Sequence, residues 1–437
     1  MSNLVAIVGR PNVGKSTLFN RLIGQRQAIM DNQAGVTRDR HYGYAEWQNK
    51  NFTVIDTGGY VEGSDDVFEG AIRDQVRLAL EEADVILFLV DTTQGLTGLD
   101  EEFANVVRRS KKPVFLVANK AETKLENHYT GEFYALGLGD VWEISAMTGS
   151  GTGDLLDAIC IHLQEDQDED PDAGIPRVAV VGRPNAGKSS LTNALLGYER
   201  NIVTDIAGTT RDAIDARYKA FGHEFILTDT AGLRRKSKLR EDQIEFYSTL
   251  RTIKAIETSD VCLVVLDATR GLEAQDITII LTAVQAKKGV VLLVNKWDAY
   301  EGKDQSSTRV FEEAIRERLP TLSYLPVVFV SAHTKQRLMK AVETMIEVYH
   351  ARRDKLPTSA LNDKMLPEIE AYPPPIHKGK SVKIKYLTQL PTHAPTFAFY
   401  CNLPQYVSDS YTRYLENKLR GHFPLAGVPI SIVYKKK

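Results

Sequence analysis

Short apolar runs alternate with amphipathic segments along most of the chain. Residues 4–8, 85–90 and 113–118 are continuous apolar runs, and each leads into a polar or glycine-rich turn. After the first run, apolar residues recur at helical spacing, at positions 18, 19, 22 and 23. Strands buried on both faces are apolar throughout, whereas surface helices carry one apolar stripe. The pattern therefore predicts α/β domains with mostly parallel, doubly wound sheets that bind ligands at the carboxyl ends of their strands.

This pattern occurs twice in the same order. Four landmarks recur at similar intervals: 173 residues for Gly9 and Gly182, 173 for Asp56 and Asp229, 176 for Asn119 and Asn295, and 186 for Ser145 and Ser331. The second copy therefore has about ten additional residues, around 300–307. Matched order and spacing indicate the duplication of one nucleotide-binding domain.

Two boundaries follow from composition. Residues 164–172 read QEDQDEDPD, with six acids and a proline in nine positions, which is typical of a solvated linker. We expect a first domain at 1–163, an acidic linker at 164–174, a second domain at 175–353 and a third at 354–437.

The third domain differs from the other two. Its pattern predicts an α+β arrangement of helix 360–371, strands 381–386 and 396–401, helix 409–422 and strand 430–434. Residues 361–437 hold eleven lysines and arginines against five acids, although the whole chain has a net charge of −3. A basic α-β-β-α-β domain with interleaved Tyr and Phe is typical of a KH-like, RNA-contacting module, but the GXXG signature is missing. A scaffold that packs against the nucleotide domains explains the domain equally well.

Bulk properties fit a cytoplasmic protein of about three domains. Three cysteines without paired spacing, Cys160, Cys262 and Cys401, argue against a disulfide framework or a zinc site. No apolar run reaches the roughly 18 residues of a membrane span. The chain enters a strand directly, without the features of a signal peptide. We therefore expect no membrane partner.

The turn after the first strand of each repeat has the form G-x-x-x-x-G-K-[ST], and eleven of sixteen positions are identical between 9–24 and 182–197. Between a strand and a helix, this pattern forms a phosphate-binding P-loop. Backbone N–H groups surround the phosphates, Lys15 and Lys188 neutralise them, and the following serines bind Mg²⁺. The predicted nucleotide contacts are Gly9, Arg10, Pro11, Asn12, Val13, Gly14, Lys15, Ser16 and Thr17, and Gly182, Arg183, Pro184, Asn185, Ala186, Gly187, Lys188, Ser189 and Ser190.

A D-x-x-G motif follows a later strand in each repeat. Its aspartate can hold the water of a Mg²⁺ ion, and its glycine can approach the terminal phosphate. The predicted residues are Asp56, Thr57, Gly58, Gly59 and Tyr60, and Asp229, Thr230, Ala231, Gly232 and Leu233. Thr37 and Thr210 are candidate metal ligands that become ordered around the γ-phosphate, and with Lys15 and Lys188 they form the predicted catalytic set. Tyr60 and Leu233 stand where many GTPases have a water-orienting glutamine, which predicts slow turnover.

The base is specified by an N-K-x-D motif, intact as Asn295, Lys296, Trp297 and Asp298. Its carboxylate can accept hydrogen bonds from the ring N–H and the amine of guanine, which adenine does not offer. Lys296 can cover the base, and Ser331-Ala332 can donate a backbone N–H to its carbonyl. The first repeat has Asn119, Lys120, Ala121 and Glu122, followed by Ser145 and Ala146. Its glutamate displaces the charge by about 1.5 Å, so we expect weaker guanine binding there.

These motifs carry a family resemblance. GRPNVGKST, GVTRD, DTGG and NKAE, then GRPNAGKSS, GTTRD, DTAGLRRK and NKWD, make the chain similar to the bacterial tandem GTPases named Der or EngA, within the TrmE-Era-EngA-like GTPases. The tail SDSYTRYLENKL…GVPISI resembles that family too. The resemblance implies GTP hydrolysis coupled to maturation of the large (50S) ribosomal subunit, and a KH-like domain that contacts rRNA or docks between the GTPase domains. It also implies that Asn12 and Asn185 help to hold an activating K⁺, and we expect a monomer.

Other classes fit less well. A nucleotide kinase would need an acceptor site and a lid with clustered arginines, and a tRNA-modifying GTPase would need a further chemical domain. A scaffold whose first repeat binds GTP without hydrolysing it remains open because of Glu122. The basic segment 233–240, with five cations in eight residues, is either a solvated helix start or a patch presented to RNA under nucleotide control.

Overall fold

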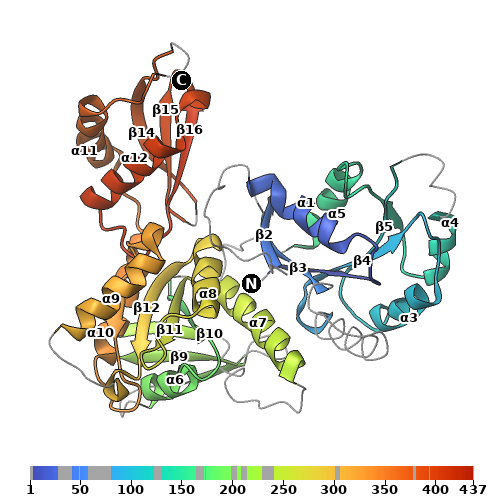
Figure 1. Cartoon of the computed structure of the whole chain (residues 1–437), viewed down its shortest axis with the longest axis horizontal. Helices are drawn as coiled ribbons and strands as arrows, with labels where there is room; N and C mark the ends of the chain where they lie inside the picture. Colours follow the sequence, from blue (N-terminus) through green and yellow to red (C-terminus); the bar gives the residue numbers. More distant parts are fainter. Residues whose placement is uncertain are drawn as a thin grey trace. The chain divides into compact units, whose positions relative to one another are not determined.

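The computed structural model places two compact units along the chain (Figure 1). The first comprises residues 1–173 and 236–257, and the second comprises 174–235 and 258–437. The residues that the structure describes are 3–27, 42–48, 50–57, 80–122, 130–163, 172, 174–197, 204–207, 214–228, 241–300, 306–376, 380–392 and 394–436.

The first unit contains a six-stranded sheet in the order β2-β3-β1-β4-β5-β6. The strands are β1 Leu4–Val8, β2 Tyr42–Trp47, β3 Lys50–Asp56, β4 Val85–Asp91, β5 Val114–Asn119 and β6 Val141–Glu143. Only β2 and β3 pair antiparallel, and the other described neighbours are parallel. Strands β1 and β4 are buried at every position, as their continuous apolar runs predict.

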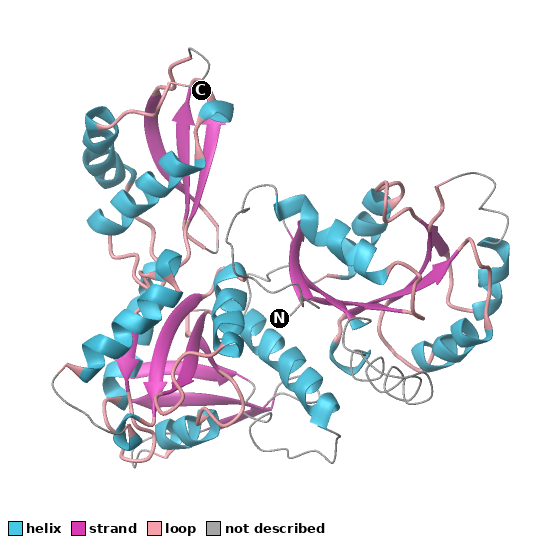
Figure 2. Cartoon of the chain, in the orientation of Figure 1, coloured by secondary structure: helices cyan, strands magenta, loops and turns pink. Residues whose placement is uncertain are grey.

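Helices cover both faces of this sheet (Figure 2). They are α1 Lys15–Gln27, α3 Gly98–Val107, α4 Thr130–Phe133 with the 3₁₀ turn η3 Tyr134–Leu136, and α5 Thr152–His162. Apolar side chains of α1 and α5 pack on one face, and those of α3, α4 and η3 pack on the other. Thr97 caps α3 and accepts from the backbone N–H of Asp100, which fixes where this helix begins.

A helix from the second repeat completes the first unit. Helix α7 runs from Glu241 to Thr258, and its Leu250 and Ile253 are buried in the same core cluster as α3 and α4. Lys254 also pairs with Glu82 at 3.1 Å. The apolar pattern within each repeat does not reveal that α7 belongs to the first unit.

The second unit repeats the fold with one more strand, in the order β13-β12-β11-β7-β10-β9-β8. The strands are β7 Arg177–Val181, β8 Thr204–Ala207, β9 Ile214–Ala220, β10 His223–Thr228, β11 Val261–Asp267, β12 Gly289–Asn295 and β13 Val327–Phe329. The helices are α6 Lys188–Leu196, α8 Ala274–Gln285, α9 Ser307–Arg318 and α10 Leu338–Arg353, with 3₁₀ turns η5 Trp297–Ala299 and η6 Pro320–Leu322. The spacing of apolar residues predicts a core stripe along α10. Four of its members are buried in the core and Ile346 is partly buried against it; the four are Leu338, Val342, Met345 and Tyr349. Strand β8 was not predicted.

The C-terminal domain forms its own three-stranded sheet within the second unit. Its elements are α11 Thr358–Ala371, β14 Ile384–Leu390, β15 Thr396–Cys401, η7 Pro404–Tyr406, α12 Asp409–His422 and β16 Ser431–Lys436. The predicted strand 381–386 was wrong in its bounds, because β14 pairs antiparallel along the whole of β15 and must extend to Leu390. The order α-β-β-α-β is confirmed.

A short loop ties this domain to the second sheet. Gly427 accepts a hydrogen bond from Val290 N–H and donates one to the carbonyl of Tyr324, both at 2.8 Å. The guanidinium of Arg420 lies 3.6 Å from the ring centroid of Tyr324, a cation–π contact. Because Val290 is near the start of β12 and Asn295 ends it, the C-terminal domain braces the strand that carries the base-recognition motif.

The three cysteines are buried and free, as expected. Of the helices in the described ranges, none combines the length and apolar character that crossing a membrane requires.

Candidate nucleotide-binding sites

The two P-loops hold their lysines in the same way. Nζ of Lys15 donates to the carbonyl oxygens of Gly9 and Arg10 at 2.9 and 2.8 Å, and Nζ of Lys188 donates to the matching pair in the second loop at 2.7 and 2.8 Å. Burial lowers the pKa of Lys15 and of Lys188 to about 8. Each loop therefore presents an ammonium group that a phosphate would stabilise.

The second glycine of each P-loop is required by a close contact. Gly14 and Gly187 have φ of 95° and 98°, which side chains rarely adopt. A Cβ atom on Gly14 would lie 2.3 Å from Nδ2 of Asn119, and one on Gly187 would lie 2.2 Å from Nδ2 of Asn295. The glycines thus make room for the asparagines of the base motif.

These asparagines join three loops in each repeat. Asn119 Nδ2 donates to the carbonyl of Val13 at 2.8 Å, and its Oδ1 accepts from Ala146 N–H at 2.9 Å. Asn295 contacts Ala186 and Ala332 in the same way, each at 3.0 Å. The backbone N–H of Ala332, one of the two predicted to be available to the base, donates to Asn295 in this structure.

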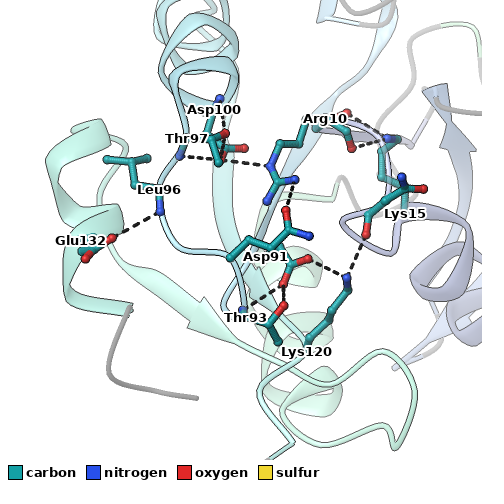
Figure 3. A network of polar contacts seen from close by, with 12 residues as sticks. Arg10, Lys15, Asp91, Thr93, Leu96, Thr97, Asp100, Lys120 and Glu132 are labelled. Carbon is teal, nitrogen blue, oxygen red and sulfur yellow. Dashed lines mark hydrogen bonds and ion pairs between the residues drawn. The ribbon is translucent and has the colours of Figure 1, made fainter. Parts of the chain in front are cut away.

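The lysines of the base motif are held by aspartates that the sequence pattern was not used to predict, and Figure 3 shows the pair in the first repeat. Lys120 Nζ lies 2.6 Å from Oδ2 of Asp91 and 2.9 Å from the carbonyl of Asn12. Lys296 pairs with Asp267 at 2.7 Å. Both aspartates end buried central strands and have a threonine two residues later, in DTTQG and DATRG, so the repeat itself contained the signal.

The arginine of each P-loop points away from the phosphate cradle. Arg10 Nε lies 3.2 Å from Oδ2 of buried Asp100, and Arg10 Nη1 donates to Gln94 at 2.8 Å (Figure 3). Arg183 pairs with Asp276 at 3.4 Å. Since Asp100 and Asp276 lie in the first turns of α3 and α8, these arginines anchor the P-loops to neighbouring helices, and a direct contact of either residue with phosphate stays a prediction.

The acids of the two base motifs differ in their surroundings. Ser145 Oγ donates to Oε1 of Glu122 at 2.8 Å. In the second repeat, the carboxylate of Asp298 lies 4.0 Å from Nδ1 of His333. Trp297 is buried against Tyr300, with ring centroids 4.8 Å apart, whereas the first repeat has Ala121 at that position. The residue between the lysine and the acid is therefore packed against an aromatic ring in the second base motif.

Two oxygen ligands suited to Mg²⁺ lie together in the first repeat. Ser16 Oγ lies 2.6 Å from Oδ2 of Asp56, at the start of α1 and the end of β3. Thr57 is held by a hydrogen bond from its hydroxyl to the carbonyl of Ile7, at 2.9 Å. A hydroxyl and a carboxylate beside a phosphate cradle are the donor set that Mg²⁺ prefers, so these residues fit the ion.

Several predicted residues lie outside the described ranges. They are Thr37, Gly58, Gly59, Tyr60, Thr210, Asp229, Thr230, Ala231, Gly232, Leu233 and the basic segment 233–240. Their assignment to phosphate, metal or partner stays a prediction.

Comparison with known proteins agrees with this geometry. A family described as a 50S ribosome-binding GTPase matches residues 4–120 and 177–296, and the elongation factor Tu GTP-binding domain matches 245–351. The C-terminal KH-domain-like family of EngA bacterial GTPase enzymes matches residues 355–435.

Relatives are similar over their whole length. The GTPase Der of Cytophaga hutchinsonii is 62% identical over 437 residues, and that of Flavobacterium johnsoniae is 58% identical over 438, with 100% of both chains covered in each case. A solved structure of Era, in complex with MgGDPNP and a segment of 16S ribosomal RNA, is 26% identical over 59% of this chain and 88% of that chain, with a TM-score of 0.32. With two GTPase domains, a KH-like domain and full-length similarity of this degree, the chain belongs to the Der (EngA) family of bacterial GTPases.

Proposed function

We propose that this chain is a GTP-hydrolysing switch that acts in the cytoplasm, as a monomer, in maturation of the large ribosomal subunit. GTP and GDP are its ligands, and its nucleotide state controls the arrangement of its domains and its association with the ribosome and rRNA. The observation that carries the GTPase part is the duplicated network in which one asparagine links the P-loop, the base motif and the Ser-Ala turn.

The phosphate chemistry rests on a few residues in each repeat. Lys15 and Lys188 neutralise the β- and γ-phosphates, because their ammonium groups already lie among the P-loop carbonyls. Mg²⁺, held by Ser16 and Asp56, would neutralise phosphate charge. Ser189, Asp229, Thr37 and Thr210 are the corresponding proposed metal ligands.

Turnover is proposed to be slow without a partner and to be stimulated by K⁺. Tyr60 and Leu233, at the positions after D-x-x-G, lack the side-chain amide with which a glutamine orients the attacking water. Asn12 and Asn185 both adopt the left-handed backbone region, with φ of 65°. The family resemblance assigns these two asparagines to K⁺. Hydrolysis measured in KCl and in NaCl at equal ionic strength tests this, and equal rates would refute the role of both asparagines.

The ribosomal part of the proposal has a different support. The family that matches both repeats is described as ribosome-binding, and the C-terminal domain carries an excess of positive charge. Positive charge of this kind favours association with phosphate backbones.

Co-sedimentation with separated ribosomal subunits tests that part. Wild type is incubated with GDP, GTP or a non-hydrolysable GTP analogue, beside Lys15→Ala and Lys188→Ala. We expect the wild type to associate with the large subunit in a nucleotide-dependent way. We expect the association of the two lysine variants to be independent of GTP. Equal association with both subunits in every nucleotide state would contradict the proposal.

A further inference from the structure

Charge is segregated within the C-terminal domain. All five of its acids between 361 and 437 lie on helices α11 and α12: Asp363, Glu368, Glu370, Asp409 and Glu416. Cations on these helices are partly neutralised, since Lys418 pairs with Glu368 at 2.7 Å and Arg420 with Glu416 at 2.8 Å. The strands carry lysines and no acid, so the sheet side of the domain is positively charged.

Four lysines lie at one end of the sheet. They are Lys383 and Lys385 at the start of β14, and Lys435 and Lys436 at the end of β16. Within the described ranges no carboxylate pairs with any of them. Because β14 and β16 both flank β15, these cations surround the end of the central strand.

A tyrosine pair lies in the middle of this cluster. Tyr386 and Tyr400 are directly opposite each other on β14 and β15, and their rings are stacked with centroids 4.4 Å apart. Lys435 is opposite Tyr400 on β16, so the three residues form one row across the sheet. A register shift between Ile384 and Tyr386 leaves Lys385 as an extra, exposed residue beside this row.

This row is on the face that the helices leave open. Leu387, Phe397 and Phe399 pack with α11 and α12 in the domain core. Side chains alternate between the two faces along a strand, so Tyr386 and Tyr400 belong to the opposite face. Both tyrosines are only partly buried.

We propose that this tyrosine–lysine face, made of Tyr386, Tyr400, Lys385 and Lys435, binds single-stranded RNA. Every base has a π-face that can stack on an exposed ring, and lysines beside the rings can contact the phosphates that connect successive bases. The face deepens the proposed function, on which it rests, by giving the rRNA contact a location that does not need a GXXG loop. Lysines on edge strands can also serve only to prevent pairing with a strand of another molecule. That role would not require a pair of stacked tyrosines between the lysines.

Binding of a fluorescein-labelled oligouridine to the full-length protein, with GDP present, tests the proposal. Fluorescence anisotropy is measured across a KCl titration. We expect Tyr386→Leu with Tyr400→Leu to weaken binding by about tenfold or more, because stacking on both rings is lost. Tyr386→Phe with Tyr400→Phe keeps the rings and should bind like wild type. Lys385→Gln with Lys435→Gln should reduce the slope of log K against log[salt] by about 1.4.

The matched control removes two cations from the helical side. Lys364 and Arg413 are exposed on α11 and α12, so Lys364→Gln with Arg413→Gln changes the net charge equally. We expect this control to retain oligouridine binding. If the control weakens oligouridine binding as much as Lys385→Gln with Lys435→Gln does, the attraction depends on net charge alone and the proposal is overturned. Unchanged binding by both the leucine and the glutamine variants would also overturn it.

Two further readouts separate this proposal from the proposed function. GDP binding must be unchanged in every variant, since none of these residues lies in a nucleotide site. If the leucine variant binds oligouridine normally but loses the large ribosomal subunit, the face contacts protein and the RNA proposal is overturned, while the ribosomal role is supported. If wild type itself fails to co-sediment with the large subunit, the proposed function fails, whatever the oligouridine result.

Discussion

Nζ of Lys120 lies 2.6 Å from Oδ2 of Asp91, and the equivalent pair in the second repeat, Lys296 and Asp267, is 2.7 Å apart. Although burial raises the pKa of Asp267, hydrogen bonds from Lys296 and Thr269 outweigh it and keep this pKa below its usual value. When the ammonium group of a lysine is held in place, the conformation of its methylene chain is restricted as well. The aspartates therefore position the two lysines that are predicted to cover the base.

Replacing Asp267 with asparagine should weaken GDP binding by the second repeat. The amide leaves the Lys296 ammonium without its charged partner, and because the pair is partly solvent-exposed, we expect a loss of about tenfold and not more. Titration with a fluorescent GDP in a Lys15→Ala background reports this site alone. Glu313→Gln, which breaks an exposed pair with Arg309, is the control. Unchanged affinity of Asp267→Asn would show that Lys296 does not need this partner.

Gly14→Ala should abolish nucleotide binding by the first repeat. The added Cβ would meet Nδ2 of Asn119 at 2.3 Å, and the residue has φ of 95°, so the loop and the base motif cannot both keep their places. Gly98→Ala is the matched control, because a Cβ there meets nothing within 4 Å. Fluorescent GDP titration in a Lys188→Ala background distinguishes the two, and retained binding by Gly14→Ala would contradict the role of this contact.

Removing the buried arginine of the first P-loop should destabilise the first unit. Asp100 is fully buried, so Arg10→Met leaves its carboxylate with hydrogen bonds from Thr97 but without its cationic partner, at a cost of up to about 3 kcal/mol in the free energy of unfolding. Arg10→Met with Asp100→Leu removes both charges and should recover most of this loss. Native-state hydrogen exchange of the β1 amides measures the free energy of unfolding of the single and of the double variant. Equal losses in the single and double variants would show that the pair does not anchor the loop.

The sequence predicted the repeated landmarks well, because each depends on a local motif in a strand–turn–helix context. Asn119 and Asn295 were assigned to the base, and the structure adds that they also fix the P-loop. Contacts such as Arg10 with Asp100 join positions 90 residues apart, which no local pattern relates. Helix α7 was not assigned to the first unit for the same reason, since its apolar stripe does not specify which surface covers it.

Nucleotide binding should take up protons above pH 8. In the free protein, burial holds the pKa of Lys15 and Lys188 at about 8, below the ordinary 10.5, so both lose their protons as pH rises through 8. Phosphate stabilises the ammonium form, and binding therefore raises these pKa values. We expect almost no uptake at pH 7 and nearly one proton per site by about pH 9.

Calorimetry of GDP binding in buffers of different ionisation enthalpy measures this uptake. Lys15→Arg, whose guanidinium stays charged, should lose the contribution of the first site. The same shift has a consequence for stability. Because the unfolded chain binds more protons than the native state between pH 8 and 10.5, the ligand-free protein should become more stable as pH rises through this window. Buffer-independent heats at pH 9 would contradict the prediction.

The last prediction concerns the acid of the first base motif, where Ser145 Oγ donates to Glu122 at 2.8 Å. If the longer side chain displaces the carboxylate from its best position, Glu122→Asp should bind GDP more tightly than wild type in a Lys188→Ala background. Ser145→Ala removes a hydrogen bond to a charged group and should weaken binding by about tenfold. The double variant measures the coupling between them, and additive effects would show that Ser145 does not position this acid. Tighter binding by wild type than by Glu122→Asp would instead show that the first site is adapted to glutamate.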